Sequence, residues 1–386
     1  MKVMSAGGYA WRVGLCGVCL AGLLVLSPGI GVTSASFGWV DAWRARLGLP
    51  IATEELADRP LVDVDGDGQV SAAELTDYAD VARYIGFELR FARSLLALQV
   101  GITLALCGAT FQTLFRNPLA TPYTLGIASG GALGALIAIK AGWELSVWGV
   151  SSTALCAFVG GLGVVGAVLW LARGARGLTS NEMLLAGVTM GLFCSAMMMV
   201  VTVLADERQV FEVIRWMMGS LDAISTTRSA MLWPFILPAW VVLIVSARAL
   251  DQYRLGDELA TTRGVNVRRL QIGCVLVATL AVAAVAAVCG PIGFVGLVVP
   301  HIAALLFGSD RRVVLPASAL LGGAFLIVCD WGAQLAMTAA GAVTGRELGG
   351  TVLPVGVVTA AVGVPVFLVL LRARRGRGGQ SPPYGR

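Results

Sequence analysis

The stretch 270-LQIGCVLVATLAVAAVAAVC-289 contains no charged side chain. A helix that crosses a bilayer needs about 20 mostly apolar residues, so this stretch is long enough to be a span by itself. Lipid offers no hydrogen-bond partners to the backbone, and a helix satisfies its own amides and carbonyls. The stretch therefore predicts a transmembrane α-helix.

The same pattern recurs along the whole chain, which is 57% hydrophobic and only 13% charged. Soluble domains carry about 25% charged residues, so a soluble protein is excluded. About ten segments are apolar enough to span a membrane, which predicts an all-α integral membrane protein. These segments are 13–32, 94–114, 120–140, 146–172, 183–204, 229–248, 270–289, 291–307, 313–336 and 352–371.

The distribution of lysine and arginine predicts the orientation. If the N-terminus is cytoplasmic and the spans alternate, most basic residues fall in cytoplasmic segments, as the positive-inside rule requires. These segments include Arg173, Arg176, Arg311, Arg312 and 372-RARRGRGG-379. We therefore expect a multi-pass inner-membrane protein with both termini in the cytoplasm. The net charge of +5 reflects this topology and does not indicate nucleic-acid binding.

The predicted spans divide the chain into four parts. They are a first transmembrane helix at 1–32, a polar outer insertion at 33–93, a membrane domain at 94–375 and a cytoplasmic tail at 376–386. Residues 1–35 also fit a cleaved signal peptide. A retained span is favoured, because its removal would place the basic tail outside.

Two Gly- and Pro-containing breaks interrupt the apolar pattern, in 108-GATFQTLFRNPLATPYTLGIASGGALGA-135 and 290-GPIGFVGLVVPHIAALLFGSDRR-312. Non-helical backbone at membrane depth is tolerated where it is buried in protein or lines a water-filled cavity. The breaks are therefore candidate walls of a translocation path, although the first also fits a helix end at the cytoplasmic surface. The candidate path residues are Gln112, Asn117, Pro118, Gly293, Phe294 and Pro300.

Asp330 lies inside a predicted span, where a carboxylate is by default a functional candidate. It would bind a coupling ion or proton in a secondary transporter, or bond neighbouring backbone and hydroxyl groups in a structural role. The sequence shows no intramembrane partner for it. His301, the only histidine, has no ligand-type residue at metal spacing and is interpreted as structural.

The sequence lacks the nucleotide-binding pattern G-x-x-x-x-G-K-[ST], and its spans contain no nucleophile–base set. We therefore expect a protein that is not an enzyme. If ATP drives it, a separate subunit binds the nucleotide.

The polar connection 250-LDQYRLGDELATTRGVNVRRL-270 predicts a short cytoplasmic helix. Acidic residues in its first turn and Gly264 after its end match helix-dipole and C-cap preferences. From composition alone, a solvated connector and a surface helix that docks a partner remain equally open.

The segment 63-DVDGDGQVSAAE-74 matches a calcium-binding EF-hand loop. The loop pattern needs oxygen ligands at defined positions and a glycine at the sharp turn, here Gly68. The expected Ca²⁺ ligands are Asp63, Asp65, Asp67, Gln69, Ser71 and Glu74. A helix from Ser71 to about Phe87 is expected to follow. An acidic turn without an ion is the alternative.

Six stretches together resemble the FecCD-type permease family of bacterial ABC importers, which carry ferric siderophores, haem or cobalamin. They run in family order over most of residues 88–375. The stretches are 88-ELRFARSLLALQVG-101, 108–135 as quoted above, 215-RWMMGSL-221, 256-GDELATTRGVNVRRLQ-271, 290–312 as quoted above and 354-PVGVVTAAVGVPVFLVLL-371.

The resemblance implies a ten-helix subunit that forms a homodimer, with the substrate path along the dimer axis. It implies that a cytoplasmic ATPase docks on the connection between the sixth and seventh helices. By position the docking residues are Gly256, Asp257, Glu258, Arg263, Gly264, Val265 and Arg268. A periplasmic binding protein would meet outward-facing arginines, which by motif position are Arg90, Arg93 and Arg346.

The chain departs from the family pattern near these arginines. Ala92 stands where the family usually has proline before the second arginine, and LGGTVL separates Glu347 from 354-PVG-356. The outer insertion is also longer than usual.

Together these features predict the permease subunit of an ATP-driven importer, for which ferric siderophore is the expected cargo. Cobalamin and haem are the alternatives within that class. An ion-coupled secondary transporter using Asp330 and a calcium-sensing membrane scaffold are alternatives from other classes.

Overall fold

The computed structural model describes residues 6–30, 39–47, 49, 72–143, 146–147, 150–172, 180–221, 229–344 and 352–377. Their order is α1 (Ala6–Leu26), η1 (Ser27–Gly29), α2 (Trp39–Leu47), α3 (Ala72–Arg83), η2 (Tyr84–Phe91), α4 (Ala92–Leu114), η3 (Pro122–Leu125), α5 (Ile127–Lys140), β1 (Ser146–Val147), β2 (Val150–Ser151), α6 (Ser152–Leu171), α7 (Ser180–Val203), α8 (Glu207–Met217), α10 (Trp233–Val245), α11 (Ala247–Tyr253), α12 (Asp257–Thr262), α13 (Val267–Cys289), α14 (Val295–Phe307), α15 (Arg311–Thr344) and α16 (Val355–Arg377).

The fold is helical, as predicted. Within the described residues six helices are long and apolar enough to cross a membrane, or seven if the bent pair α10–α11 forms one span. Helices α5, α14 and α16 are apolar but shorter. Every predicted apolar segment overlaps a helix, but the count of ten spans stays a prediction.

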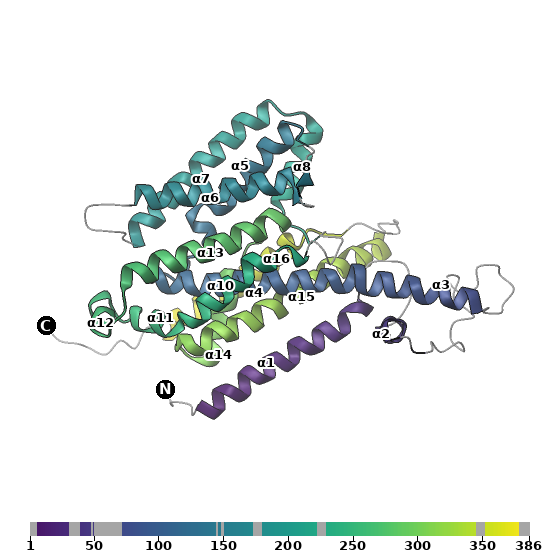
Figure 1. Cartoon of the computed structure of the whole chain (residues 1–386), viewed down its shortest axis with the longest axis horizontal. Coiled ribbons are helices and arrows are strands. Elements are labelled where there is room, and N and C mark those ends of the chain that lie inside the picture. Colours follow the sequence, from purple (N-terminus) through teal and green to yellow (C-terminus); the bar gives the residue numbers. More distant parts are fainter. Residues whose placement is uncertain are drawn as a thin grey trace.

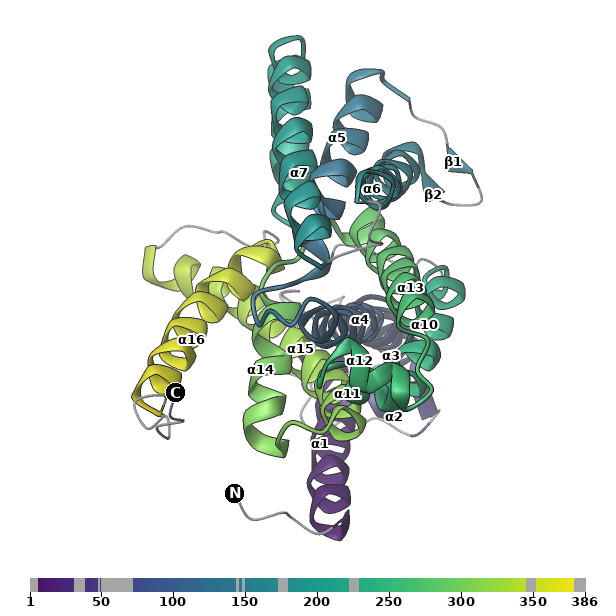
Figure 2. The ribbon, with the colours of Figure 1, turned by 90° about the vertical axis from the view of Figure 1, so that its left-hand side faces the viewer.

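Helix α4 lies at the centre of the molecule, with α13, α14 and α15 around it (Figure 2). Helices α5, α6, α7 and α8 form a second group, to which α13 connects through α5 and α6 (Figure 1). Most of α4 is buried, including its polar residues Gln99, Thr103 and Thr110. Helix α4 therefore forms the buried centre on which the surrounding helices pack.

Two predicted helix starts were wrong, and one helix is longer than its apolar segment. One helical run of 37 residues continues from Tyr78 to Leu114 through the π-helical stretch η2, across the predicted end of the insertion at residue 93. The segment 120–126 is largely a 3₁₀ turn before α5. The fourth segment begins with a two-residue antiparallel hairpin, in which Ser146 pairs with Ser151, before α6 starts. Local hydrogen bonding, which hydropathy does not report, decides each of these boundaries.

Candidate translocation site and cytoplasmic helix

A break separates α13 from α14 at residues 290–294. Gly290 has φ of 69° and ends α13, and Pro291 cannot donate a helical hydrogen bond. The amide of Ser220 donates to the Cys289 carbonyl at 2.8 Å, so the end of α13 is tied to the segment after α8. The break is therefore held in place by protein backbone, as non-helical backbone at membrane depth requires.

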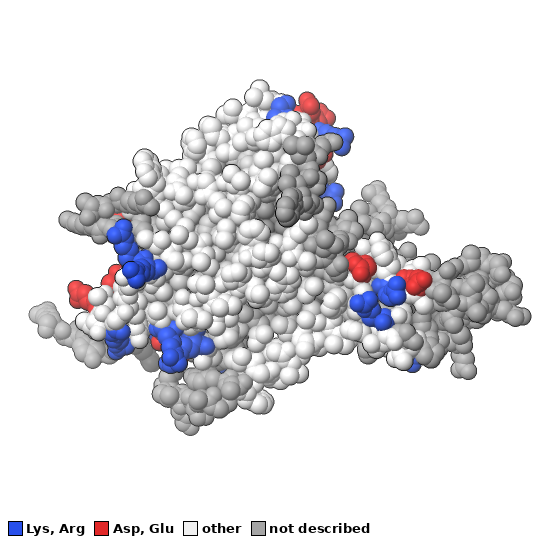
Figure 3. All heavy atoms as spheres, viewed as in Figure 1, with Lys and Arg blue, Asp and Glu red and all other residues white. Residues whose placement is uncertain are grey.

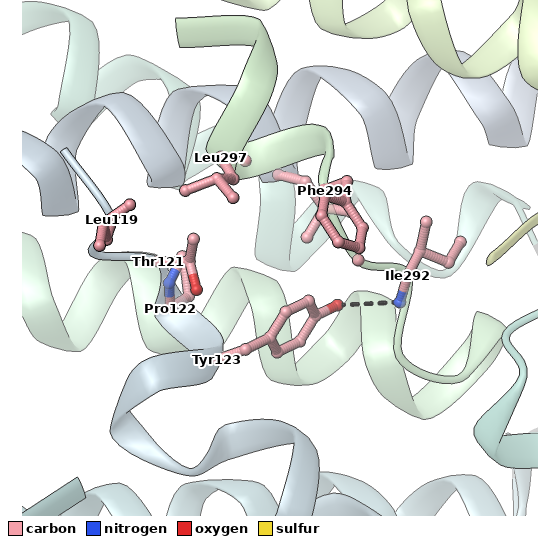
Figure 4. Close-up of a pocket in the computed structure, with 10 residues that line it drawn as sticks. Leu119, Thr121, Pro122, Tyr123, Ile292, Phe294 and Leu297 are labelled. Atoms are coloured by element: carbon pink, nitrogen blue, oxygen red, sulfur yellow. Dashed lines mark hydrogen bonds between the residues drawn. The ribbon is translucent and has the colours of Figure 1, made fainter. Parts of the chain in front are cut away.

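A cavity of about 220 Å³ lies beside this break (Figure 4). Its lining is mostly apolar and comes from α4, α14, the break and the segment before α5. The lining residues are Leu104, Leu119, Thr121, Pro122, Tyr123, Ile292, Gly293, Phe294, Gly296 and Leu297. The hydroxyl oxygen of Tyr123 accepts a hydrogen bond of 3.3 Å from the Ile292 amide, which joins the two walls.

Phe294 adopts an unusual backbone conformation at the cavity wall. Its φ of 66° is in the left-handed region, where a residue with a bulky side chain is strained. Gly363 of α16 lies against it, since a Cβ added at Gly363 would come 2.5 Å from the Phe294 Cβ. Contacts with neighbouring elements thus fix a conformation that Phe294 would not adopt alone.

Gln112 completes the hydrogen bonding of α14. Pro300 has no amide hydrogen, so the Gly296 carbonyl four residues earlier lacks its helical donor. The Gln112 side-chain amide donates to this carbonyl at 3.3 Å and to the Leu297 carbonyl at 3.1 Å. Gln112 therefore joins α4 to the start of α14.

The structure brings some of the predicted path residues together and separates others. Gly293 and Phe294 line the cavity, and Gln112 and Pro300 support its wall. Asn117 instead accepts a hydrogen bond from the Leu119 amide at 2.9 Å and stabilises a turn, and Pro118 is exposed. The sequence reasoning missed Tyr123, whose only local signal is the Thr-Pro-Tyr turn.

The predicted short helix, α12 (Asp257–Thr262), lies at the C-terminal end of α4. Asp257 and Glu258 occupy its first turn, and Gly264 after its end has φ of 84°, as predicted. The remaining members of the predicted docking set, Gly256, Arg263, Val265 and Arg268, are at least partly exposed. Helix α12 thus presents a polar surface at one end of the molecule.

Two side chains connect α11 and α12 to the end of α4. Arg116 forms an ion pair with Asp257, and it donates to the Tyr253 carbonyl at 2.8 Å. Its guanidinium carbon also lies 4.5 Å from the centre of the Tyr253 ring. The buried Tyr253 hydroxyl donates to the Leu114 carbonyl at 3.2 Å and accepts from Gln271 at 2.9 Å. The ion pair with Asp257 therefore links α12 directly to the end of α4, and Tyr253 of α11 ties the helix before α12 to the same end.

The predicted docking arginines have a different environment from the one expected. Arg93 Nε donates to both Asp330 oxygens at 2.9 and 3.1 Å, and Gln334 donates to Asp330 at 2.8 Å. Arg90 is buried and donates to the Pro28 carbonyl at 3.3 Å. The expectation that Asp330 has no partner was therefore wrong, while the docking role of Arg90 and Arg93 stays a prediction. Both residues face protein because η2 continues α4 as a helix.

The remaining predicted residues lie outside the cavity and the α12 end, or outside the part of the chain that the structure describes. Residues 63–71 of the calcium-type loop and Arg346 lie outside the described residues. Helix α3 begins at Ala72, one residue after the predicted start. His301 is buried, and its ring lies 6.4 Å from that of Phe367. No cluster of three metal-ligating side chains occurs among the residues that the structure describes.

The apolar helices, the break between α13 and α14 and the polar end helix indicate a helical membrane protein. The family comparison makes this more specific, because the FecCD transport family model matches residues 64–373. The chain belongs to the FecCD transport family.

Curated relatives agree with this assignment. The hemin transport system permease protein HmuU of Yersinia pestis is 36% identical, covering 79% of this chain and 88% of the relative. The cobalamin import system permease protein BtuC of Halobacterium salinarum is 33% identical, covering 98% of this chain and all of the relative. The vitamin B12 import system permease protein BtuC of Escherichia coli is 35% identical, covering 75% of this chain and 84% of the relative.

A solved structure shares the fold. It is described as an inward-facing conformation of a metal-chelate type ABC transporter. The TM-score is 0.74 at 24% sequence identity, covering 94% of this chain and 99% of that one. This likeness establishes the architecture alone.

Proposed function

We propose that the chain is the permease subunit of an ATP-driven importer. The observation that carries the proposal is the position of α12, a polar end helix joined to α4, in a chain of the FecCD transport family. ATP binding and hydrolysis in separate cytoplasmic subunits would move α12 and open the path alternately to each side. The permease itself would not be an enzyme.

The cargo we propose is a metal tetrapyrrole, cobalamin or haem, ahead of the ferric siderophore predicted from the sequence. The names of the relatives support this order, because they include hemin and cobalamin systems. The cavity of the single chain has mostly apolar walls and no charged lining residue, so selection would then depend on the binding protein.

The partners we propose are two cytoplasmic ATPase subunits, a periplasmic binding protein, a second copy of this chain and membrane lipid. Exposed apolar side chains on α7 and α16, among them Leu192 and Val369, support burial against lipid and a second copy. Native mass spectrometry of the purified chain tests the homodimer, because a monomer under gentle detergent conditions would contradict it.

A secondary transporter is not favoured. Asp330 is 1% exposed at its side chain and is held by Arg93, so it is not a free carboxylate available to a coupling ion. Uptake that collapses with the proton gradient and ignores the ATPase would reverse this preference.

The experiment that tests the function is uptake in a strain lacking this gene, compared with the complemented strain. Labelled cobalamin, haem and ferric siderophore are offered separately, with and without an ATPase-inactive partner. We expect one metal chelate to depend on both the permease and active ATPase. If all three are taken up equally in both strains, the cargo class is wrong.

We also propose that residues 63–74 bind Ca²⁺ and stabilise the outer insertion. The loop pattern supports this, as does the start of α3 at Ala72, because a helix follows such a loop. In extracellular modules the dissociation constant is about 10⁻⁴–10⁻³ M. Calorimetry on the full chain should show binding in this range that Glu74→Gln abolishes and Asp80→Asn retains. Equal heats for wild type and Glu74→Gln would contradict the site.

A further inference from the structure

The segment 116–125 connects the cytoplasmic helix to the cavity, and each of its ends is tied to a different element. At its start Arg116 contacts Asp257 and the carbonyl of Tyr253. Near its end the Tyr123 hydroxyl accepts the hydrogen bond from Ile292 in the break between α13 and α14. One short piece of chain therefore contacts both α12 and the cavity wall.

Consecutive hydrogen bonds stiffen this segment. The Ala120 amide donates to the Asn117 carbonyl at 3.1 Å, and the Thr124 amide donates to the Thr121 carbonyl at 3.0 Å. The Gly126 amide donates to the Tyr123 carbonyl at 2.9 Å. Each turn of the segment is closed by its own bond, so the segment is a short, ordered connection between its two ends.

We propose that residues 116–125 transmit movement from α12 to the cavity. Arg116 would follow the movement of α12 through its contact with Asp257, and Tyr123 would pass it to the cavity wall through its contact with Ile292. The inference rests on the proposed function, since it supposes that an ATPase moves α12. A shift of Arg116 with Asp257 would pull on Tyr123, change its hydrogen bond to Ile292 and move the wall at Phe294. Arg116 and Tyr123 are positioning residues in this scheme.

The Arg116–Asp257 ion pair and the cavity wall at Phe294 are both suited to change during transport. The side chains of Arg116 and Asp257 are 43% and 55% exposed, and exposed ion pairs add little to stability. Phe294 is in a strained conformation that neighbouring contacts maintain. Loss of the Arg116–Asp257 pair or of the Tyr123–Ile292 hydrogen bond should therefore affect coupling between α12 and the cavity more than it affects folding.

The test uses the complete transporter in proteoliposomes with its ATPase, binding protein and the cargo identified by uptake. The variants are Arg116→Met, which removes the charge, and Tyr123→Phe, which removes only the hydroxyl. Arg116→Lys is the conservative rescue. The control is Arg208→Met, which breaks an exposed ion pair with Glu212 on α8. Co-purification of the ATPase, ATP hydrolysis and cargo moved per ATP are measured for each.

We expect Arg116→Met and Tyr123→Phe to retain the ATPase and to hydrolyse ATP normally. Cargo moved per ATP should fall at least about fivefold, the lower end of usual coupling between sites. Arg116→Lys should recover part of the loss, and Arg208→Met should match the wild type.

Two results would overturn the inference. Wild-type cargo per ATP in both variants would show that the segment transmits nothing. Loss of ATPase binding and hydrolysis in Arg116→Met would show a docking role instead. If the wild type hydrolyses ATP without moving any of the three cargoes, the proposed function fails first, and the inference fails with it.

Discussion

Gln112 shows how a single residue decides the shape of the cavity wall. Pro300 leaves the Gly296 carbonyl without its helical donor, and no water is available in a bilayer to replace it. The Gln112 amide supplies the donor from α4. Removing that amide while the carbonyl stays buried should cost about 1–3 kcal/mol of stability.

We therefore expect Gln112→Leu to lower the thermal stability of the purified protein in detergent. The matched variant is Pro300→Ala, which restores an amide to α14 and makes Gln112 less necessary. In the double variant the loss should be smaller than the sum of the two single losses, as expected for residues that share a partner. Strict additivity would show that Gln112 and Pro300 act independently.

At the scale of the element, α4 owes its central position to two glycines on its surface. A Cβ at Gly101 would overlap the carbonyl of Gly322 on α15, and one at Gly108 would overlap the carbonyl of Gly296 on α14. Small residues permit such backbone contact between membrane helices. Helix α4 can therefore lie directly against two neighbours.

Gly108→Ala should destabilise the fold by about 1–3 kcal/mol, because α14 has to move away from α4. Gly273→Ala is the control, since nothing lies within 4 Å of an added Cβ there. Alanine is the better helix former by about 1 kcal/mol, so the control should be neutral or slightly stabilising. Both are measured by thermal unfolding in the same detergent, and equal effects would contradict the close contact.

Features that depend on neighbouring residues in the chain could be predicted from the sequence, and features that depend on contacts between distant elements could not. Hydropathy locates the apolar helices, and local chemistry predicts α12, because acids in its first turn and Gly264 act within a few residues. The Arg93–Asp330 pair joins residues 237 positions apart, so no local pattern reports it. The left-handed Phe294 was also missed, because its conformation depends on packing around Gly363.

At the scale of the whole molecule, the visible charged side chains lie toward the two ends and at the top of the α5–α8 group, and the face between them is uncharged (Figure 3). The end that carries α12 holds many arginines, among them Arg263, Arg268 and Arg312. Acidic side chains lie at both ends, among them Asp257 at the α12 end and Asp80, beside Arg83, at the other. By the positive-inside rule we expect the α12 end to lie in the cytoplasm.

This orientation predicts opposite labelling of two engineered cysteines. Tyr84, 56% exposed, lies at the outer end, and Thr262 is exposed at the end of α12. In intact spheroplasts a membrane-impermeant thiol reagent should label Tyr84→Cys and not Thr262→Cys. Permeabilised cells should give labelling of both, and the wild-type chain measures the background from its eight native cysteines. If only Thr262→Cys reacts in intact spheroplasts, the orientation is reversed, and α12 would lie where no cytoplasmic ATPase reaches it.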